Sequence, residues 1–325
     1  MASIFLKKLL TYKYCLNIYL QKFRIATELF YTMKLSTKTY YYLILHLTVI
    51  IWGFTGILGK LINMSSSSIV LDRMLIAFVT LAIVMVIKKR KEHVLWHYKW
   101  QMLLVGFITA AHWATFFEAI KVSNISVTLC CLASCSFFIA LIQPLFLKTR
   151  LKFYELILGM FVVLAIYIIF SFENKYSLGI ILSLTSAFFA AIFSVWNAIF
   201  IKNNSSLVIT LYEMLGGTIA MFLYLIIVGE FNLLSIIPTG NDWFYILVLG
   251  VICTALAFLL GTEVLKELSP FTVSISINLE PIYAILLALW IFGESEIMSI
   301  EFYIGAAIIL TTIILNAFFK AKESK

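Results

Sequence analysis

Ionisable side chains lie in the middle of long apolar segments of this sequence. Glu280, two residues after Asn278 and followed by Pro281, is one, and His112, followed by Trp113, is another. A carboxylate or imidazole among apolar side chains is costly unless it meets a partner, a solute or a proton. We therefore treat both as candidate binding groups. The alternative is structural: the acid caps backbone groups freed by the proline, and a neutral histidine bonds a backbone carbonyl.

Other polar and aromatic residues extend this candidate set. Ser134 aligns with Glu280 in an internal repeat described below, and Trp52 and Asn197 lie within the first and sixth apolar segments. Aromatic side chains either line cavities or pack on neighbouring helices, and both interpretations stay open. The candidate substrate-binding residues are His112, Trp113, Ser134, Asn278, Glu280, Tyr283, Trp52 and Asn197.

Four charged residues form a second candidate set, for gating or proton coupling. Arg73 and Glu118 are expected towards one face of the apolar layer, where pairing would offset the cost of burial. Glu213 and Glu263 are expected towards the opposite face, with Lys266 as a further partner. Either these charges change partners during a functional cycle, or they form static salt bridges.

Patterns for other chemistries are missing from the sequence. There is no GxxxxGK[ST] nucleotide-binding loop, no HExxH and no CxxC pair. His93 and His97 have metal-ligand spacing but no third ligand beside them. We predict no catalytic residues, no metal and no cofactor.

The composition indicates which elements must hold these residues. Of the 325 residues, 63% are hydrophobic and 12% charged, with a mean hydropathy of +1.04, whereas soluble proteins have roughly 45–50% apolar and about 25% charged residues. A membrane-spanning helix needs about 20 apolar residues. Such runs cover residues 40–62, 67–87, 100–120, 124–147, 153–171, 177–201, 206–228, 242–265, 270–292 and 300–319. We predict an all-α polytopic membrane protein with ten transmembrane helices, which excludes a soluble enzyme and a single-span receptor.

Lysine and arginine are distributed unequally between the two sides of these helices. With a cytoplasmic N-terminus, about 20 fall on the inner side and about 3 on the outer side. The outer ones are Lys60, Lys121 and Lys175. Because cytoplasmic loops carry the excess of positive charge, we expect both termini in the cytoplasm. The net charge of +8 then needs no nucleic-acid partner.

The two halves of the chain share a spacing pattern. Ser123 aligns with Ser269, and the basic loop 148–152 aligns with an acidic loop that holds Glu294 and Glu296. Five helices per half is an odd number, so the second half must be inserted upside down. An inverted 5+5 repeat is typical of secondary transporters, whose site lies near mid-membrane between the halves.

The beginning of the chain differs from the rest. Basic residues interrupt residues 1–32 every few positions, and no signal-peptide pattern is present. A basic amphipathic surface helix, a disordered segment and a translation start at Met33 are the open alternatives. The predicted organisation is an extension at 1–39, a first repeat at 40–171, a second repeat at 177–319 and a cytoplasmic tail at 320–325.

The stretch LSPFTVSISINLEPIYAILLALWIFGESEIMSIEFYIGAAIIL resembles the EamA-type transporters of the drug/metabolite transporter superfamily. The matching elements are Pro270, Glu280-Pro281, Gly293-Glu294 and Gly305, and in the first repeat Trp52-Gly53 and Arg73 with Ala77. The first repeat departs from the pattern at Ser134-Cys135 and Leu147-Lys148. The resemblance covers about residues 40–319 and implies transport of varied small solutes, including amino acids.

We therefore expect a multi-pass plasma-membrane protein that moves small metabolites by alternating access. Export of amino acids or amphipathic compounds is the expectation closest to the resemblance. The expected partners are a small-molecule substrate, the lipid bilayer and protons as coupling ions, without nucleic acid. A lipid-modifying membrane enzyme and a passive channel are the alternative functions.

Overall fold

The computed structural model describes residues 36–323 except 90, 91, 93, 151, 173 and 233–235. The expectations for residues 1–35, which include nearly all of the predicted extension, lie outside the described residues, as does the end of the tail. The chain divides into two units, Met1–Leu43 and Ile44–Lys325. Every contact discussed below lies within the second unit.

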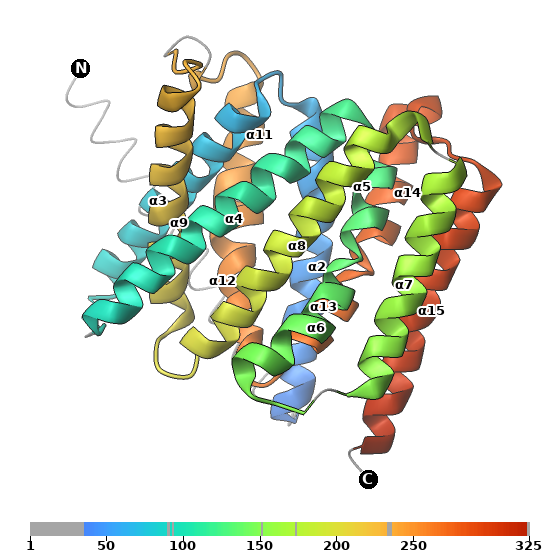
Figure 1. Ribbon diagram of the computed structural model, residues 1–325. Helices are drawn as coiled ribbons and strands as arrows, with labels where there is room; N and C mark the ends of the chain where they lie inside the picture. Colours follow the sequence, from blue (N-terminus) through green and yellow to red (C-terminus); the bar gives the residue numbers. More distant parts are fainter. Residues whose placement is uncertain are drawn as a thin grey trace. The chain divides into compact units, whose positions relative to one another are not determined.

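All regular elements in the described ranges are helical (Figure 1). The first half comprises α2 (Thr37–Leu61), α3 (Ser66–Ile87), α4 (Trp96–Val122), α5 (Ile125–Leu132), α6 (Cys135–Leu147) and α7 (Phe153–Phe172). The second half comprises α8 (Ser177–Phe200), α9 (Ser206–Ile227), α11 (Asp242–Gly250), the π-helical segment η2 (Val251–Leu256), α12 (Ala257–Glu263), α13 (Pro270–Ile277), α14 (Glu280–Phe292) and α15 (Ile300–Glu323). Three short 3-10 turns complete them: η1 (Asn174–Tyr176), η3 (Val264–Lys266) and η4 (Gly293–Glu296).

Nine helical segments of the described chain are long and apolar enough to cross a membrane, when α5 with α6, α11 with η2, α12 and η3, and α13 with α14 each count as one span. Helix α15 contains a shorter apolar stretch, Ile300–Asn316. Large apolar side chains such as Ile227 and Trp290 are more than 80% exposed, as expected for surfaces that face lipid. The predicted all-α polytopic fold is confirmed.

Matching helix boundaries relate the two halves. Helices α3 and α9 are both 22 residues long, and the N-cap side chains Ser65 and Ser205 accept hydrogen bonds at equivalent positions. Helices α6 and α14 are both 13 residues long and begin at Cys135 and Glu280. The structural counterpart of Glu280 is therefore Cys135, one residue after Ser134, which the sequence alignment had paired with it.

The halves do not form separate domains but interleave. Helix α4 packs against α8 and α9, α3 against α9 and α11, and α5 and α6 against α8, while α7 and α15 run side by side (Figure 1). One core cluster combines Met74 and Phe117 of the first half with Met214, Leu249 and Ala284 of the second. Residues from both halves therefore converge in the interior.

Two spans are interrupted near their middle, each for a local chemical reason. Between α5 and α6, the Ser134 and Ser136 hydroxyls donate to the carbonyls of Cys131 and Ala133 at 2.8 and 2.9 Å, replacing regular helical pairing. Between α13 and α14, Pro281 lacks an N–H and stands in the first turn of α14, where that donor would have no helical partner. Interrupted helices expose backbone and polar groups at membrane depth, which requires a protein-lined interior.

Candidate functional site

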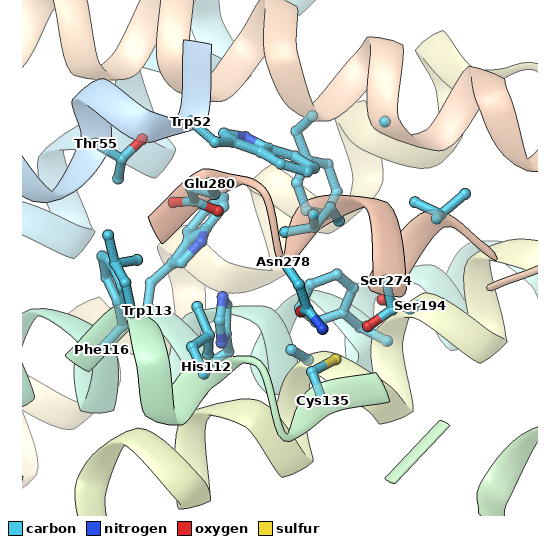
Figure 2. Close-up of a pocket in the computed structure, with 18 of the residues that line it drawn as sticks. Trp52, Thr55, His112, Trp113, Phe116, Cys135, Ser194, Ser274, Asn278 and Glu280 are labelled. Atoms are coloured by element: carbon cyan, nitrogen blue, oxygen red, sulfur yellow. The ribbon is translucent and has the colours of Figure 1, made fainter. Parts of the chain in front are cut away.

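A cavity of about 120 Å³ lies among α2, α3, α4, α5, α6, α8, α12, α13 and α14 (Figure 2). Both interrupted spans contribute to it, through Ala133 and Cys135 on one side and Asn278 and Glu280 on the other. Its polar lining consists of Thr55, Arg73, His112, Ser194, Asn197, Thr262, Ser274, Asn278 and Glu280. Its aromatic lining consists of Trp52, Trp113, Phe116, Phe193 and Phe258.

Helical periodicity explains how α8 reaches this cavity. Ala190, Phe193, Ser194 and Asn197 have the spacing i, i+3, i+4, i+7, which places them on one face. Helix α12 and the turn after it contribute a face with the same spacing, Phe258 to Leu265. The lining is thus set by helix phase on the two elements.

Arg73 is fully buried and lines the cavity. Its Nε donates to Thr254 Oγ1 at 2.9 Å, and that hydroxyl donates onward to the carbonyl of Leu249 at 2.7 Å. The guanidinium lies over the Trp113 ring, 3.9 Å from the centroid. The Nη1 atom has no hydrogen-bond partner among the described residues. Thr254 belongs to the π-helical segment, so this local distortion positions the arginine.

Glu280 is 6% exposed and opens α14. Figure 2 shows its carboxylate close to Trp52 and Trp113. In the described ranges, no ion pair or hydrogen bond joins it to another side chain, and the Nδ2 atom of Asn278 is likewise buried without a partner. The positive end of the α14 dipole favours an acid at this position. The Glu280 carboxylate and the Asn278 amide therefore keep unused hydrogen-bonding groups in the protein interior.

His112 combines a structural contact with a cavity position. Its Nδ1 lies 3.0 Å from the Ser186 carbonyl oxygen and 2.8 Å from the Ser186 hydroxyl. That hydroxyl also donates to the His112 carbonyl at 2.8 Å, which ties α4 to α8. The carbonyl contact is the one that the structural interpretation of this histidine required, and the ring nevertheless lines the cavity.

The structure brings six of the eight candidate substrate-binding residues to the cavity: His112, Trp113, Asn278, Glu280, Trp52 and Asn197. Ser134 and Tyr283 do not line it. Ser134 is buried in the turn between α5 and α6, with its hydroxyl on Cys131, and Cys135 takes the place in the lining. Tyr283 lies against Gly53 of α2. Ser134 misses the lining because the sequence alignment of the repeats, which pairs it with Glu280, differs by one residue from the structural alignment, which pairs Cys135 with Glu280.

The four candidate gating residues occupy four different settings. Arg73 and Glu118 form no ion pair in this conformation, because Glu118 is exposed while the arginine points to Thr254. Glu213 is fully buried, and its Oε2 accepts a bond from Asn197 Nδ2 at 3.3 Å. Glu263 pairs with Lys266 at 2.5 Å. Only Arg73 of the four lines the cavity.

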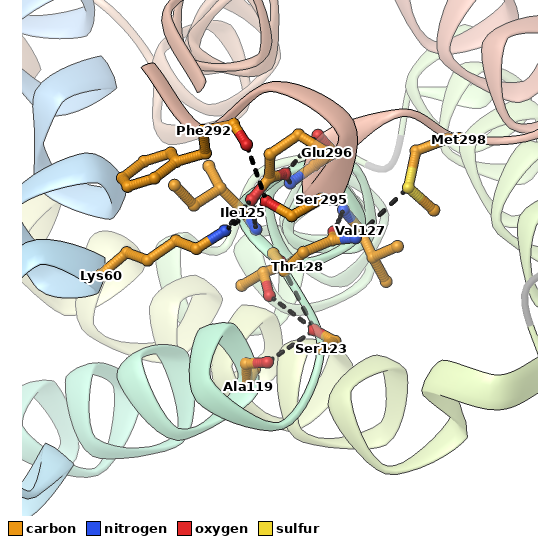
Figure 3. A network of polar contacts seen from close by, with 12 residues as sticks. Lys60, Ala119, Ser123, Ile125, Val127, Thr128, Phe292, Ser295, Glu296 and Met298 are labelled. Atoms are coloured by element: carbon orange, nitrogen blue, oxygen red, sulfur yellow. Dashed lines mark hydrogen bonds and ion pairs between the residues drawn. The ribbon is translucent and has the colours of Figure 1, made fainter. Parts of the chain in front are cut away.

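A polar network closes the bundle around Glu296 (Figure 3). This carboxylate is fully buried; Lys60 Nζ lies 2.8 Å from its Oε1. It also accepts bonds from the Ile125 and Ser126 backbone N–H groups and from the Ser126 hydroxyl, at 3.3, 3.1 and 2.8 Å. An acid at a helix N-terminus is favoured by both hydrogen bonding and the helix dipole. We call this side of the bundle the Glu296 end.

At the opposite side, which we call the Lys266 end, the Glu263–Lys266 ion pair joins neighbouring turns of one segment and does not link the two repeats. The cavity lining continues there to Leu265, directly before Lys266. The start of α13 at this end is held by a neutral group, since Gln143 Oε1 accepts from the Phe271 N–H at 3.1 Å. The start of α5 is thus held by the carboxylate of Glu296, whereas the start of α13 is held by the neutral amide of Gln143.

Several lining residues were not identified from the sequence as binding residues. Arg73 was assigned only to gating, and Cys135, Ser194 and Ser274 were not singled out. A search for small or polar residues at i, i+3, i+4, i+7 within otherwise apolar segments would have found the α8 face. The apolar segment around Arg73 indicates that its charge faces the protein interior, but nothing in the local sequence indicates that it lines this cavity.

Comparisons with known proteins agree with this architecture. The model of the EamA-like transporter family matches residues 39–171 and 177–318. A crystal structure of another protein superposes with a TM-score of 0.64 at 15% identity, over 85% of this chain and 96% of that one. No curated protein matches the chain. The family model spans both halves, and the predicted resemblance is confirmed: the chain belongs to the EamA-like transporter family.

Proposed function

We propose that this protein is a secondary transporter that moves small metabolites by alternating access around the central cavity. Amino acids or amphipathic compounds are the proposed solutes, and protons are the proposed coupling ions. The protein would lie in the plasma membrane with both termini in the cytoplasm, so that the Lys266 end faces inward. This orientation rests on the excess of lysine and arginine on that side.

One observation carries the proposal: a polar and aromatic cavity lies at the meeting point of two interrupted spans, one from each repeat. Interrupted helices at membrane depth are the usual solute sites of secondary transporters. Polar groups with unused hydrogen bonds in such a place are costly unless a solute or water satisfies them.

The network at Glu296 supports a gating role for the helix ends. It joins α2 and α5 of the first repeat to η4 of the second, so relative rocking of the repeats would break it. We propose that the network keeps the outer side closed while the cavity is reached from the Lys266 end. The buried Glu213 and the Glu263–Lys266 pair are the proposed inner counterparts.

Counterflow in proteoliposomes tests the function. Vesicles loaded with an unlabelled solute are diluted into the labelled solute, and a transporter accumulates label transiently by exchange. Solutes for the assay come from a thermal-shift panel on purified protein, since a ligand that binds the folded state raises its melting temperature. A membrane enzyme would instead convert the solute, and a passive channel would show no acceleration by solute on the far side. Either result contradicts the proposal.

A further inference from the structure

Arg73 carries a charge that its protein surroundings leave unbalanced. The residue is fully buried, and its only hydrogen bond in the described structure runs from Nε to the neutral Thr254 hydroxyl. The Nη1 donor has no hydrogen-bond partner within the described ranges. A buried charge normally pairs with an opposite charge, because an unpaired ion in an apolar interior is strongly destabilising.

The acids near Arg73 in sequence or in space do not supply this pair. Asp72 is its chain neighbour, but adjacent residues on a helix point in different directions, and no ion pair joins the two. Glu280 lines the same cavity without an ion pair to the arginine. The remaining described ion pairs involve Glu296 and Glu263. Arg73 therefore has no direct ion-pair partner among the described residues, and a bound ligand can supply one.

The surroundings of Arg73 fix its orientation. The Trp113 ring covers one face of the guanidinium at 3.9 Å, and Phe117 lies 5.2 Å away. Thr254 holds the Nε edge. A guanidinium held in this way presents its remaining N–H groups in a planar fork, the geometry that matches a carboxylate. The same side chain lines the cavity, although it is fully buried in this conformation, so contact with a bound solute requires neighbouring side chains of the lining to move apart.

We propose that Arg73 binds the carboxylate of the transported solute and that Glu280 binds its ammonium group. The inference rests on the proposed transport function and names the class of solute: a zwitterion. Neither Arg73 nor Glu280 has an ion-pair partner among the described residues, so one ligand with two opposite charges satisfies both at once. An anion alone would leave Glu280 unpaired, and a cation alone would leave Arg73 unpaired.

The rest of the lining constrains the remainder of the solute. Trp52, Phe193 and Phe258 contribute aromatic surface to the cavity. Such surface favours an apolar or aromatic group beside the two charges. Phenylalanine is therefore a suitable probe, and it has two matched analogues: 3-phenylpropanoate lacks the ammonium group, and phenethylamine lacks the carboxylate.

Equilibrium binding of these three compounds to the purified full-length protein tests the inference. Phenylalanine should bind at least about tenfold more tightly than either analogue, because each analogue loses one charged hydrogen-bonding partner. Equal affinity for phenylalanine and phenethylamine overturns the role of Arg73. This comparison needs no substitution, so it stands even where a variant fails to fold.

Arg73→Gln and Arg73→Lys separate binding from structural support. The Gln variant should lose about tenfold or more in affinity for phenylalanine and 3-phenylpropanoate, with the affinity for phenethylamine unchanged. Lys, which keeps the charge but not the fork, should recover part of the loss. Arg150→Gln, on an exposed loop, is the matched control and should change none of the three affinities. An equal loss for all three compounds with Arg73→Gln assigns Arg73 a structural role and overturns the inference.

Failure of this inference differs from failure of the transport function. If the three probes do not bind while another solute from the thermal-shift panel shows counterflow, the protein is a transporter and the zwitterion assignment is wrong. If no solute shows counterflow, the transport proposal itself fails, and the assignment of a transported zwitterion fails with it.

Discussion

Two side chains of opposite charge, Arg73 and Glu280, line one cavity without an ion pair to the described protein. Their burial is expensive in an apolar interior, so a purely structural role would be better served by a direct pair or by neutral residues. The free-energy cost of burying these two charges is offset when a ligand pairs with them during part of the transport cycle. Residue-scale experiments therefore separate binding from stability.

Glu280→Gln tests the carboxylate in the cavity. We expect counterflow of a bound solute to fall by about 10- to 100-fold, since a charged hydrogen-bond partner of the solute is lost, while the melting temperature changes little. Glu230→Gln, at an exposed position, is the control. Counterflow unchanged by the cavity substitution would remove Glu280 from the proposed site.

Glu296→Gln tests the polar network that closes the Glu296 end. The amide cannot accept all the bonds that Lys60 and the Ser126 backbone and hydroxyl groups now make to the carboxylate. Leaving buried donors unpaired should lower the free energy of unfolding by about 1–3 kcal/mol, measured by denaturation in detergent micelles. Glu294→Gln is the matched control, because that neighbouring acid is exposed. Equal stability of the two variants would show that the network does not hold this end.

At the scale of elements, the close crossing of α4 and α9 determines how the halves meet. A Cβ at Gly106 would lie 2.9 Å from the Gly217 nitrogen and would also contact the Glu213 carbonyl oxygen. The two backbones are therefore in near contact, which small residues allow in membrane helices. The same crossing places Glu213 beside Asn197, a cavity residue.

Gly106→Val tests this crossing. The larger side chain must push α9 away, and we expect a loss of about 1–3 kcal/mol in stability, with a smaller loss for Gly106→Ala. Leu104→Val, at a position that is 61% exposed on the same helix, should remain within about 0.5 kcal/mol of the parent. Thermal unfolding followed by circular dichroism compares the three variants. Similar values for Val and the control would contradict a close helix contact.

At the scale of the whole molecule, the inverted repeat predicts on which side of the membrane each loop lies. Lys148 follows α6 and Glu294 follows α14, so the two positions should lie on opposite sides of the membrane. In a cysteine-free background, Glu294→Cys should react with an impermeant maleimide on intact cells. Lys148→Cys should react only after permeabilisation. Reaction of both from one side would overturn the architecture.

Access to the cavity can be followed with a native thiol. Cys135 lines the cavity, whereas Cys130, Cys131 and Cys253 are buried outside its lining. With Cys15 replaced by Ser, a small thiol reagent applied from the Lys266 end should modify Cys135 first, and a bound solute should slow this reaction. Modification that persists at the same rate in Cys135→Ser would show that the reagent does not report on the cavity.

The sequence determined the chain-level features, because they follow from composition and periodicity. Apolar runs of membrane-spanning length predict the helices wherever they fold, and the confirmed polytopic fold agrees with them. The Glu-Pro pair at 280–281 likewise indicated a break in the ninth span, since Pro281 has no N–H to continue the preceding helix. The family followed from the order of these motifs.

Only the tertiary structure decided which side chains share the cavity. Arg73 meets Trp113 and Thr254 because α3, α4 and the π-helical segment pack together, and no local pattern encodes that meeting. Ser134 and Cys135 are neighbours in sequence, yet only the second lines the cavity, because the turn before α6 sets the helix phase. Composition and spacing act within one segment, whereas a binding site depends on the rotation and register between segments that packing alone fixes.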